Sequence, residues 1–242
     1  MDIGTNTELI VGNKHKILAA SCPAGPAFEG GKISCGMPGL PGAIEKVTLR
    51  PDGTFAVQVI GGGPAEGICG SGLVDLLGEL LRTKRMNARG RFEKPGDKIV
   101  VAAGGDEPVC FTAGDVNELA QAKGANVAGL CIVFDQYGIR PEALDVFYLA
   151  GGFGRNLNVE SSKRIGLIPD LAEAKIRQVG NAAIEGACIA LLSRAKRAEL
   201  EDLVKRVVHC RLEAHPRFFD CFVEGCQFRP IEFPNRPRDS TP

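Results

Sequence analysis

The chain has 242 residues with 29 basic and 29 acidic side chains, and this formal net charge of zero gives no electrostatic case for nucleic acid or an anionic membrane as a partner. Hydrophobic residues make up 44% and charged residues 24%, which excludes a disordered chain and is typical of a globular one. No apolar run approaches the roughly 18 residues of a membrane helix, and no signal peptide is visible. Nine cysteines without a Cys-x-x-Cys pair favour a reducing compartment, so we expect a cytoplasmic protein with mostly free thiols.

The first half of the chain predicts two β-hairpins and a helix. The expected strands are residues 2–11, 15–20, 43–49 and 54–60. The turns between the paired strands are Gly12-Asn13 and Asp52-Gly53. Residues 22–43 and 61–72 are rich in glycine and proline, so we expect ordered loops there, and the second loop leads into a helix over residues 71–82.

The second half alternates helices with strands. Thr112 and Asp115 have the spacing of a capping box and open an apolar helix that should reach Tyr137 and end at Gly138. Further expected strands are residues 99–102, 145–149 and 175–179, and further expected helices are residues 159–165, 182–197 and 199–207. This alternation predicts an α/β protein, and the tail over residues 234–242 is expected to be disordered.

The first candidate site is Asp2-Ile3-Gly4-Thr5-Asn6, where a strand leads into a tight hairpin. Backbone N–H groups in such a segment can wrap a phosphate, and the Asp2 carboxylate could hold Mg²⁺ through water. A plain hairpin with a polar start would have the same sequence, because short motifs recur by chance. The motif alone therefore leaves both interpretations open.

Two further glycine segments are candidate ligand sites. Gly151-Gly152-Phe153 follows a strand of the buried type, and glycines at the carboxyl end of a parallel strand let a flat ligand approach the backbone. Its spacing is not that of a Rossmann dinucleotide site. Gly70-Ser71-Gly72 opens a helix, whose free N–H groups accept anions. A tight turn in the first case and close helix packing in the second are the alternatives.

In combination, these segments resemble the nucleotide lobe of the actin, sugar-kinase and heat-shock-chaperone ATPase superfamily. Further segments narrow the resemblance: Ala24-Gly25-Pro26-Ala27-Phe28-Glu29-Gly30, Ile33-Ser34-Cys35-Gly36-Met37, Gly42-Ala43-Ile44, Gly166-Leu167-Ile168-Pro169, Gly180-Asn181-Ala182-Ala183 and Ala214-His215-Pro216. Residues 2–233 resemble the C-terminal ATPase domain of the reductive activators of corrinoid proteins. The resemblance implies a ribonuclease-H-like α/β lobe with a mixed sheet, helices on both faces and an inserted β-hairpin region.

The resemblance also implies a function. Family members use ATP with Mg²⁺ to drive the reduction of cob(II)alamin to cob(I)alamin on a corrinoid protein that serves methyl transfer, and they form homodimers. By motif, the phosphate loop is assigned to Asp2, Gly4, Thr5 and Asn6, and the adenosine loop to Gly151, Gly152 and Phe153. Contacts to the nucleotide or to the corrinoid partner are expected from Gly25, Phe28, Glu29, Gly30, Ser34, Cys35, Gly36, Gly70, Ser71 and Gly72.

The chain also departs from the family pattern. It holds one Asp-x-Gly phosphate loop where the superfamily uses two, and it lacks the Cys-x₄-Cys-x₂-Cys run of the plant-type [2Fe–2S] domain that family members carry at their N-terminus. We therefore expect an N-terminally truncated or split product that binds ATP weakly alone and turns it over negligibly. Another activator or kinase of the superfamily, and a non-catalytic remnant that only binds a partner protein, remain alternatives.

Several polar residues are expected to have structural roles. The spacing of His209, Cys210, His215, Cys221 and Cys226 fits no closed zinc finger. Thiols beside the glycine loops, at Cys22, Cys35 and Cys69, are expected to be unreactive rather than redox-active. Lys123 is expected to be a solvated helix lysine rather than a nucleotide contact.

The helix that ends at Tyr137 is apolar on nearly all sides, and such a helix is normally buried on all sides. We expect the helix over residues 182–197 to cover part of it and a second copy of the chain to cover the rest. A fully buried position in the core of a single chain is the alternative.

Overall fold

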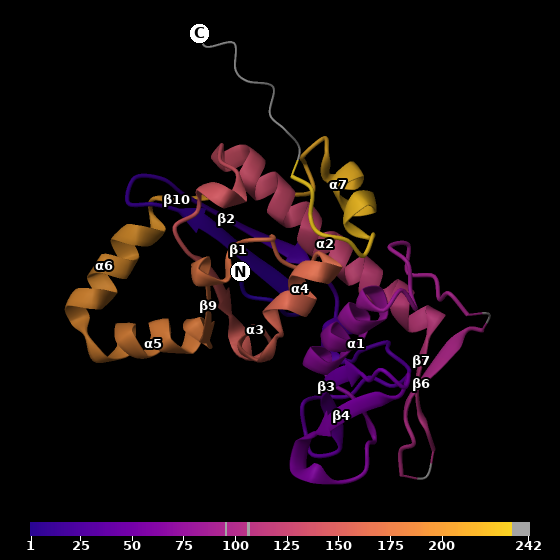
Figure 1. Ribbon diagram of the computed structural model, residues 1–242. Coiled ribbons are helices and arrows are strands. Elements are labelled where there is room, and N and C mark those ends of the chain that lie inside the picture. Colours follow the sequence, from indigo (N-terminus) through magenta and orange to yellow (C-terminus); the bar gives the residue numbers. More distant parts are fainter. Residues whose placement is uncertain (95, 106, 234–242) are drawn as a thin grey trace.

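The computed structural model describes residues 1–94, 96–105 and 107–233, and the predicted disordered tail lies outside these residues (Figure 1). The strands are β1 (Asn6–Gly12), β2 (Ile17–Pro23), β3 (Ala43–Leu49), β4 (Phe55–Val59), β5 (Gly67–Ile68), β6 (Lys98–Ala102), β7 (Val109–Thr112), β8 (Phe147–Ala150), β9 (Ile176–Gly180) and β10 (Val207–His209). The helices are α1 (Gly70–Arg82), α2 (Ala113–Tyr137), α3 (Gly151–Asn156), α4 (Val159–Ile165), α5 (Ala182–Leu192), α6 (Arg194–Val204) and α7 (Phe218–Gly225), and a 3-10 turn, η1, spans Ala27–Glu29. The predicted α/β class is confirmed.

The sheet that carries the candidate site has two parts. In the first, β1 pairs antiparallel with β2, which confirms the first hairpin, and β10 pairs parallel with β2. In the second, β8 pairs parallel with β9, so the sheet is mixed as predicted. The first strand begins at Asn6 rather than at Asp2, because Asp2 makes separate single bridges to Glu8 and to Ala150. Gly4 and Thr5 form a bend between Asp2 and the start of β1.

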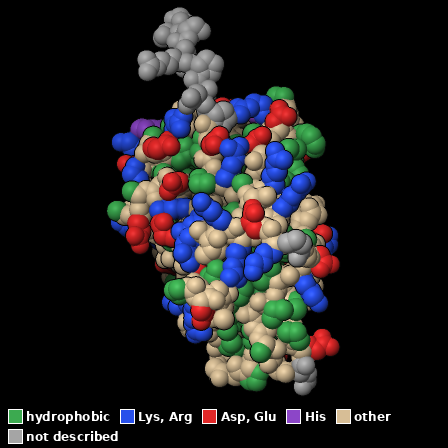
Figure 2. All heavy atoms as spheres, turned by 45° about the vertical axis from the view of Figure 1, so that its right-hand side comes forward, with side chains coloured by type: hydrophobic (Ala, Val, Ile, Leu, Met, Phe, Trp, Pro, Cys, Tyr) green, Lys and Arg blue, Asp and Glu red, His purple; other side chains and the backbone are tan. Residues whose placement is uncertain are grey.

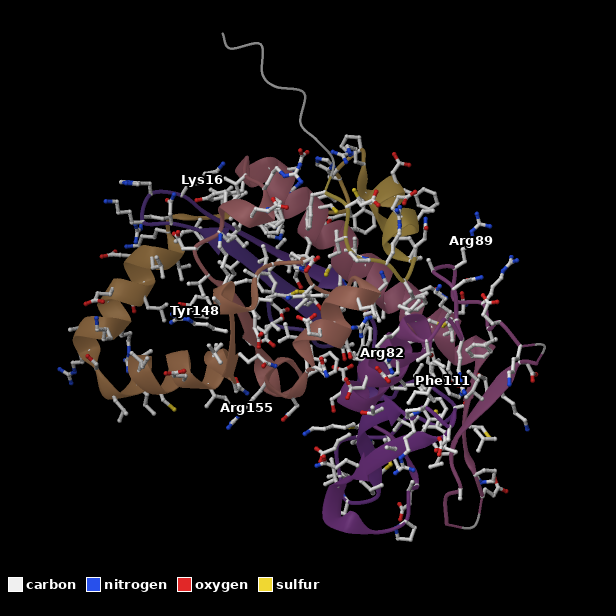
Figure 3. All side chains as sticks on the ribbon, in the orientation of Figure 1. Lys16, Arg82, Arg89, Phe111, Tyr148 and Arg155 are labelled. Atoms are coloured by element: carbon white, nitrogen blue, oxygen red, sulfur yellow. The ribbon has the colours of Figure 1, made fainter. Side chains whose placement is uncertain are left out.

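The inserted region forms the lower part of the molecule in Figure 1. Strands β3 and β4 pair as the predicted second hairpin, and β5 pairs parallel with β3. Helix α1 packs on β3 and α4, and its residues from Gly70 to Leu80 are all buried. A further hairpin, β6–β7, includes the unpredicted strand β7, whose fully buried Phe111 stacks near Phe92 with ring centroids 6.5 Å apart (Figure 3).

Helix α2 is the longest helix of the described chain, and its predicted boundaries are confirmed. Thr112 Oγ1 accepts a hydrogen bond from the Asp115 backbone N–H, and Asp115 Oδ2 accepts one from the Thr112 backbone N–H at 2.8 Å, which completes the capping box. Gly138 ends the helix in the left-handed region with φ 93°. One side of α2 packs on β1 and β2, and another side packs on α7.

The prediction that residues 182–197 form one helix covering α2 is wrong. This segment forms α5 and the start of α6, because Ser193 breaks the helix and caps α6 by accepting a hydrogen bond from the Lys196 backbone N–H at 3.2 Å. The apolar side chains of α5 are exposed, with Leu192 85% exposed. Helix α7, which the sequence analysis missed, covers α2 instead. The helix expected over residues 199–207 ends at Val204, and β10 follows it.

The surface of the described chain matches the balanced composition. Figure 2 shows basic and acidic side chains interspersed over one face of the molecule, with hydrophobic side chains between them. Within the described residues, none of the helices combines the length and the apolarity that crossing a membrane requires.

Replacing Asp115 by alanine tests the contact between α2 and the loop before β3. The buried carboxylate accepts hydrogen bonds from the Ser34 backbone N–H and hydroxyl, both at 2.6 Å, besides capping α2. We expect Asp115→Ala to lower the free energy of unfolding by about 2–3 kcal/mol, because a cap is lost and its donors are left without partners. Urea unfolding followed by circular dichroism measures this loss. The exposed neighbour Asn117 supplies the control, since Asn117→Ala should change stability by less than about 0.5 kcal/mol.

Candidate functional site

The two segments predicted to hold a nucleotide are joined through the backbone of residues 1 and 2. The Asp2 N–H donates to the Glu8 carbonyl at 2.9 Å, and the Glu8 N–H donates to the Asp2 carbonyl at 3.0 Å. On the other side, the Ala150 N–H donates to the Met1 carbonyl at 2.8 Å, and the terminal ammonium donates to the Tyr148 carbonyl at 2.9 Å. The Asp-x-Gly segment and the glycine segment that follows β8, Gly151-Gly152, therefore lie close together on one side of the domain.

Gly151 is the point where these two segments touch. Its φ of 83° lies in the left-handed region, and a Cβ atom at this position would overlap Asp2 Oδ1. A side chain is therefore excluded twice, by backbone conformation and by the Asp2 carboxylate. The next residue, Gly152, is exposed and has no atom within 4 Å of a Cβ built on it. The backbone at Gly152 is thus open to the surroundings.

Thr5 in the candidate phosphate loop already binds a carboxylate. Its backbone N–H donates to Glu29 Oε1 at 2.8 Å, and its hydroxyl donates to Glu29 Oε2 at 2.7 Å. Both residues are exposed, so the pair lies where solvent and ligands have access. The Gly25 N–H donates to the Thr5 carbonyl at 2.9 Å and fixes the other side of the loop. The two Thr5 donors therefore accommodate the oxygens of a carboxylate, which is an anionic group.

Three more of the predicted segments meet beside this pair. The ring of Phe153 lies 5.7 Å from the ring of Phe28, measured between centroids. A Cβ atom on Gly70 would overlap the Phe28 carbonyl oxygen and would lie 2.6 Å from Phe153 Cε2. The start of α1, the turn η1 and helix α3 therefore approach one another closely at these residues, and the Phe153 ring is half-buried against them.

Other predicted contact residues hold the loops in place through internal contacts. Gly36 packs on Gly30, since a Cβ atom there would lie 2.7 Å from the Gly30 Cα atom. The Cys35 carbonyl accepts a hydrogen bond from the Ile68 N–H at 2.7 Å, and burial raises the pKa of its thiol to about 12, as does the nearby Asp115 carboxylate. Further contacts of this kind are those of Ser34 with Asp115, of Ser71 Oγ with the Glu45 carbonyl, and of Gly72 with the Ile44 carbonyl.

Lys123 differs from its prediction as a solvated lysine. It is 1% exposed, and its ammonium donates to the carbonyl of Gln227 at 2.7 Å and to that of Gly225. Burial lowers the pKa of Lys123 to about 7. The error arose because α7 was not predicted, and it is the end of α7 that supplies these carbonyls. Lys123 therefore joins two helices and has no contact with the candidate nucleotide loops.

The remaining predictions concern thiols and metal ligands. Burial raises the pKa of Cys22 to about 11, in agreement with an unreactive thiol. Among the residues that the structure describes, no group of three or more His, Cys, Asp or Glu side chains is arranged to hold a metal ion.

A cavity of about 950 Å³ adjoins the backbone junction between the two parts of the sheet. Residues 1 and 2 lie at one end, and the sides come from β1 and β8. Its walls are mainly apolar, with Leu9, Val11, Phe134 and Phe147 among them. Such walls suit apolar side chains better than phosphates, so the polar part of the candidate site is the open surface at Thr5, Glu29 and Gly152.

A mixed sheet with an Asp-x-Gly hairpin beside a glycine turn defines the nucleotide lobe of an actin-like ATPase. A family model described as the C-terminal domain of RACo, the ASKHA domain, matches residues 1–237, and the chain belongs to this family. This confirms both the predicted family and the ribonuclease-H-like fold.

Two curated relatives and one solved structure are similar to the chain. The corrinoid activation enzyme RamQ of Eubacterium limosum is 34% identical over 94% of this chain and 42% of its own length. The [Co(II) methylated amine-specific corrinoid protein] reductase of Methanosarcina barkeri is 28% identical over 85% of this chain and 41% of its own length. The structure of a reductive activator for corrinoid, iron-sulfur protein superposes with a TM-score of 0.86 at 36% identity, over 95% of this chain and 39% of that one. The chain therefore spans about two fifths of the length of these relatives.

Paired substitutions in the glycine turn test its geometry. We expect Gly151→Ala to lower the free energy of unfolding by about 1–2 kcal/mol, because alanine is strained in the left-handed region and displaces the Asp2 carboxylate. Gly152→Ala should leave stability within about 0.5 kcal/mol, since its added Cβ would meet open space. Urea unfolding of the two variants side by side gives the answer, and equal losses would contradict the assigned contact with Asp2.

Proposed function

We propose that residues 2–233 form the nucleotide-binding lobe of an ATP-dependent reductive activator, which helps to reduce cob(II)alamin to cob(I)alamin on a corrinoid protein. The family membership and the activities for which the relatives are named support this proposal. The observation that carries it is that the Thr5 N–H and hydroxyl both donate to an anionic group, the Glu29 carboxylate, in the segment that follows Asp2. The exposed backbone of Gly152 follows the strand to which Met1 is bonded. In the relatives, the [2Fe–2S] cluster would belong to the part that this chain does not span.

In this proposal the chain's residues bind and orient ATP. Gly4, Thr5 and Asn6 present backbone and side-chain donors to the phosphates, and Asp2 holds Mg²⁺ through water. The exposed backbone of Gly152, together with Gly151 and Phe153, lies toward the adenosine. Hydrolysis of bound ATP supplies the free energy that an uphill one-electron reduction requires. Because the chain presents one phosphate loop, we expect weak binding and negligible turnover by the chain alone.

The partners follow from the same proposal. A corrinoid protein is the substrate of the activator, in a cytoplasmic methyltransferase system. A second copy of the chain is proposed as a further partner, since the apolar side chains of α5 lie exposed in the single chain. These side chains include Ile184, Ile189, Leu191 and Leu192.

Titration of the purified chain with Mg·ATP tests nucleotide binding. We expect a dissociation constant of about 0.1–1 mM by isothermal titration calorimetry, equivalent to about 4–5.5 kcal/mol of binding free energy. Asp2→Ala should weaken binding at least about tenfold, because the carboxylate that would hold Mg²⁺ is lost. Asp52→Ala removes an exposed carboxylate from the β3–β4 turn and should have no effect. Absence of binding at millimolar ATP would favour the alternative of a non-catalytic, partner-binding remnant.

Glu29 should compete with the nucleotide for the Thr5 donors. Its carboxylate occupies both of them, and its negative charge repels phosphate. We therefore expect Glu29→Gln to tighten binding of ATP without magnesium by about three- to tenfold, which corresponds to about 0.7–1.4 kcal/mol. Glu8→Gln is the control, because it removes the same charge from β1 without touching Thr5. Weaker binding by Glu29→Gln would instead make Glu29 part of the ligand site.

A further inference from the structure

Helices α2 and α7 pack against each other backbone to backbone. A Cβ atom on Gly225 would lie 2.7 Å from Val127 Cβ and 2.9 Å from the Gly124 carbonyl oxygen, so the two glycines allow the close approach. The helices run antiparallel, since Lys123 of α2 bonds to residues at the end of α7 while Asp135 pairs with Arg217 just before its start, at 3.8 Å. Residues one turn further along α2 therefore face residues one turn earlier in α7.

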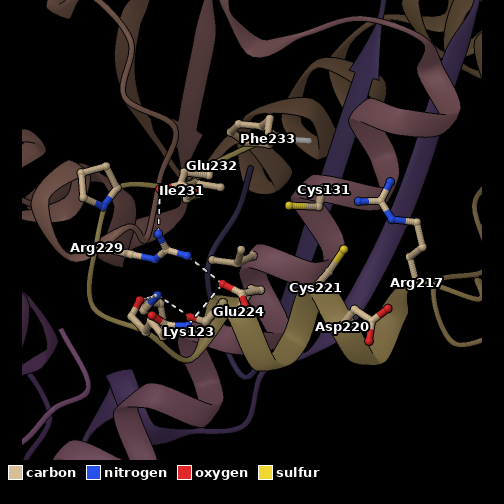
Figure 4. A pocket seen from close by; sticks show the side chains of 14 residues that line it. Lys123, Cys131, Arg217, Asp220, Cys221, Glu224, Arg229, Ile231, Glu232 and Phe233 are labelled. Atoms are coloured by element: carbon tan, nitrogen blue, oxygen red, sulfur yellow. Dashed lines mark hydrogen bonds and ion pairs between the residues drawn. The ribbon is translucent and has the colours of Figure 1, made fainter. Parts of the chain in front are cut away.

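Two cysteines occupy these facing positions. Cys131 lies four residues after Val127, and Cys221 lies four residues before Gly225, which is about one turn in each helix. Both thiols are buried in one apolar cluster and line the same cavity of about 410 Å³ (Figure 4). The exposed Glu232 and the half-buried Arg217 line the same cavity, so the cavity that contains the thiols adjoins the surface.

The neighbouring thiol favours a thiolate at Cys221. A hydrogen bond from the Cys131 thiol and the Arg217 guanidinium lower the pKa of Cys221 to about 7, against burial and the carboxylates of Asp220 and Asp135, which raise it. The pKa of Cys131 is raised by the same hydrogen bond and by burial. Cys22 and Cys35, by contrast, have pKa values raised to about 11 and about 12 by burial. A thiolate is the nucleophile in thiol–disulfide exchange, and here it lies next to a second thiol that can resolve a mixed disulfide.

We propose that Cys131 and Cys221 form a dithiol site that small soluble disulfides convert into a disulfide between α2 and α7. In the first step the Cys221 thiolate attacks one sulfur of the small disulfide. The bond between the two sulfurs of the small disulfide breaks, and the other half leaves as a thiolate that takes up a proton from water. The Cys131 sulfur then attacks Cys221 Sγ in the mixed disulfide, and the second small thiol leaves with the proton of Cys131. Two protein thiols are thereby oxidised by two electrons, and one small disulfide is reduced to two thiols.

The new bond would enclose residues 132–220, which include β8, β9, α5, α6 and β10. A covalent link across so long a loop restricts the unfolded chain, and we expect the melting temperature to rise by about 5–10 °C. It would also fix α7 to the helix whose first turn holds the Ser34 loop. Oxidation of Cys131 and Cys221 would therefore rigidify the contact between α2 and α7, which does not include the candidate nucleotide loops.

Peptide mapping of the full chain tests the proposal. The reduced chain is treated with 2-hydroxyethyl disulfide, quenched by alkylation and digested, and the cross-linked peptides are quantified by mass spectrometry. We expect the Cys131–Cys221 link to form at least about tenfold faster than any other pairing of the nine cysteines, and dithiothreitol to reverse it. Random pairing, or a link that forms mainly through the exposed Cys188, would overturn the proposal.

Three variants separate the two steps. Cys131→Ser should stop the reaction at a mixed disulfide on Cys221, and Cys221→Ser should slow labelling of Cys131 at least about tenfold. Cys188→Ser should leave the cross-link unchanged. If either buried variant fails to fold, the mapping of the unmodified chain decides alone. None of these readouts involves ATP, so their failure is distinguishable from failure of the proposed nucleotide binding.

Discussion

The candidate site depends on the backbone pairing of residues 1 and 2 with both parts of the sheet. Asp2 is bonded to Glu8 of β1 on one side, while Met1 is bonded to Tyr148 and Ala150 of β8 on the other. Within the described residues, β1 and β8 are not paired with each other as strands, and both line an apolar cavity. The relative position of the Asp-x-Gly segment and the glycine turn is therefore set by four backbone hydrogen bonds, which do not depend on side-chain identity.

Side-chain identity matters where the loops cross one another. The turn η1, the start of α1 and the glycine turn approach so closely that Gly70 and Gly151 leave no room for a Cβ atom. Phe28 and Phe153 fill the space between these segments, and Glu29 bonds to Thr5 at its edge. The high glycine content, 31 residues of the chain, thus has a local cause at this site: backbone must lie against backbone for the loops to share one surface.

The sequence predicted the parts of the fold that have local signals. The capping box of α2, both hairpins and the boundaries of α4 follow from turn and capping residues within a few positions. The residues of the site loops were assigned through the family resemblance. Helix α7 and β10 were missed because they are short and gain their stability from distant partners, α2 and β2. Because α7 was missed, Lys123 was predicted to be solvated and residues 182–197 were predicted to pack on α2. Both predictions were wrong, since the burial of a residue depends on segments that are distant in the sequence.

An apolar helix such as α2 needs something besides hydrophobic contact to fix its rotation, because each of its sides is about equally suited to burial. Three buried polar residues meet this need in the described structure. Asp115 bonds to Ser34, Asn126 accepts a hydrogen bond from the Cys22 thiol at 3.5 Å, and Lys123 bonds to the backbone at the end of α7. Rotation of α2 would leave these groups buried without partners, at a cost of about 1–3 kcal/mol each. The polar residues thereby turn one side of α2 toward the Ser34 loop and β2, and another side toward α7. In this orientation Cys131 of α2 lies opposite Cys221 of α7.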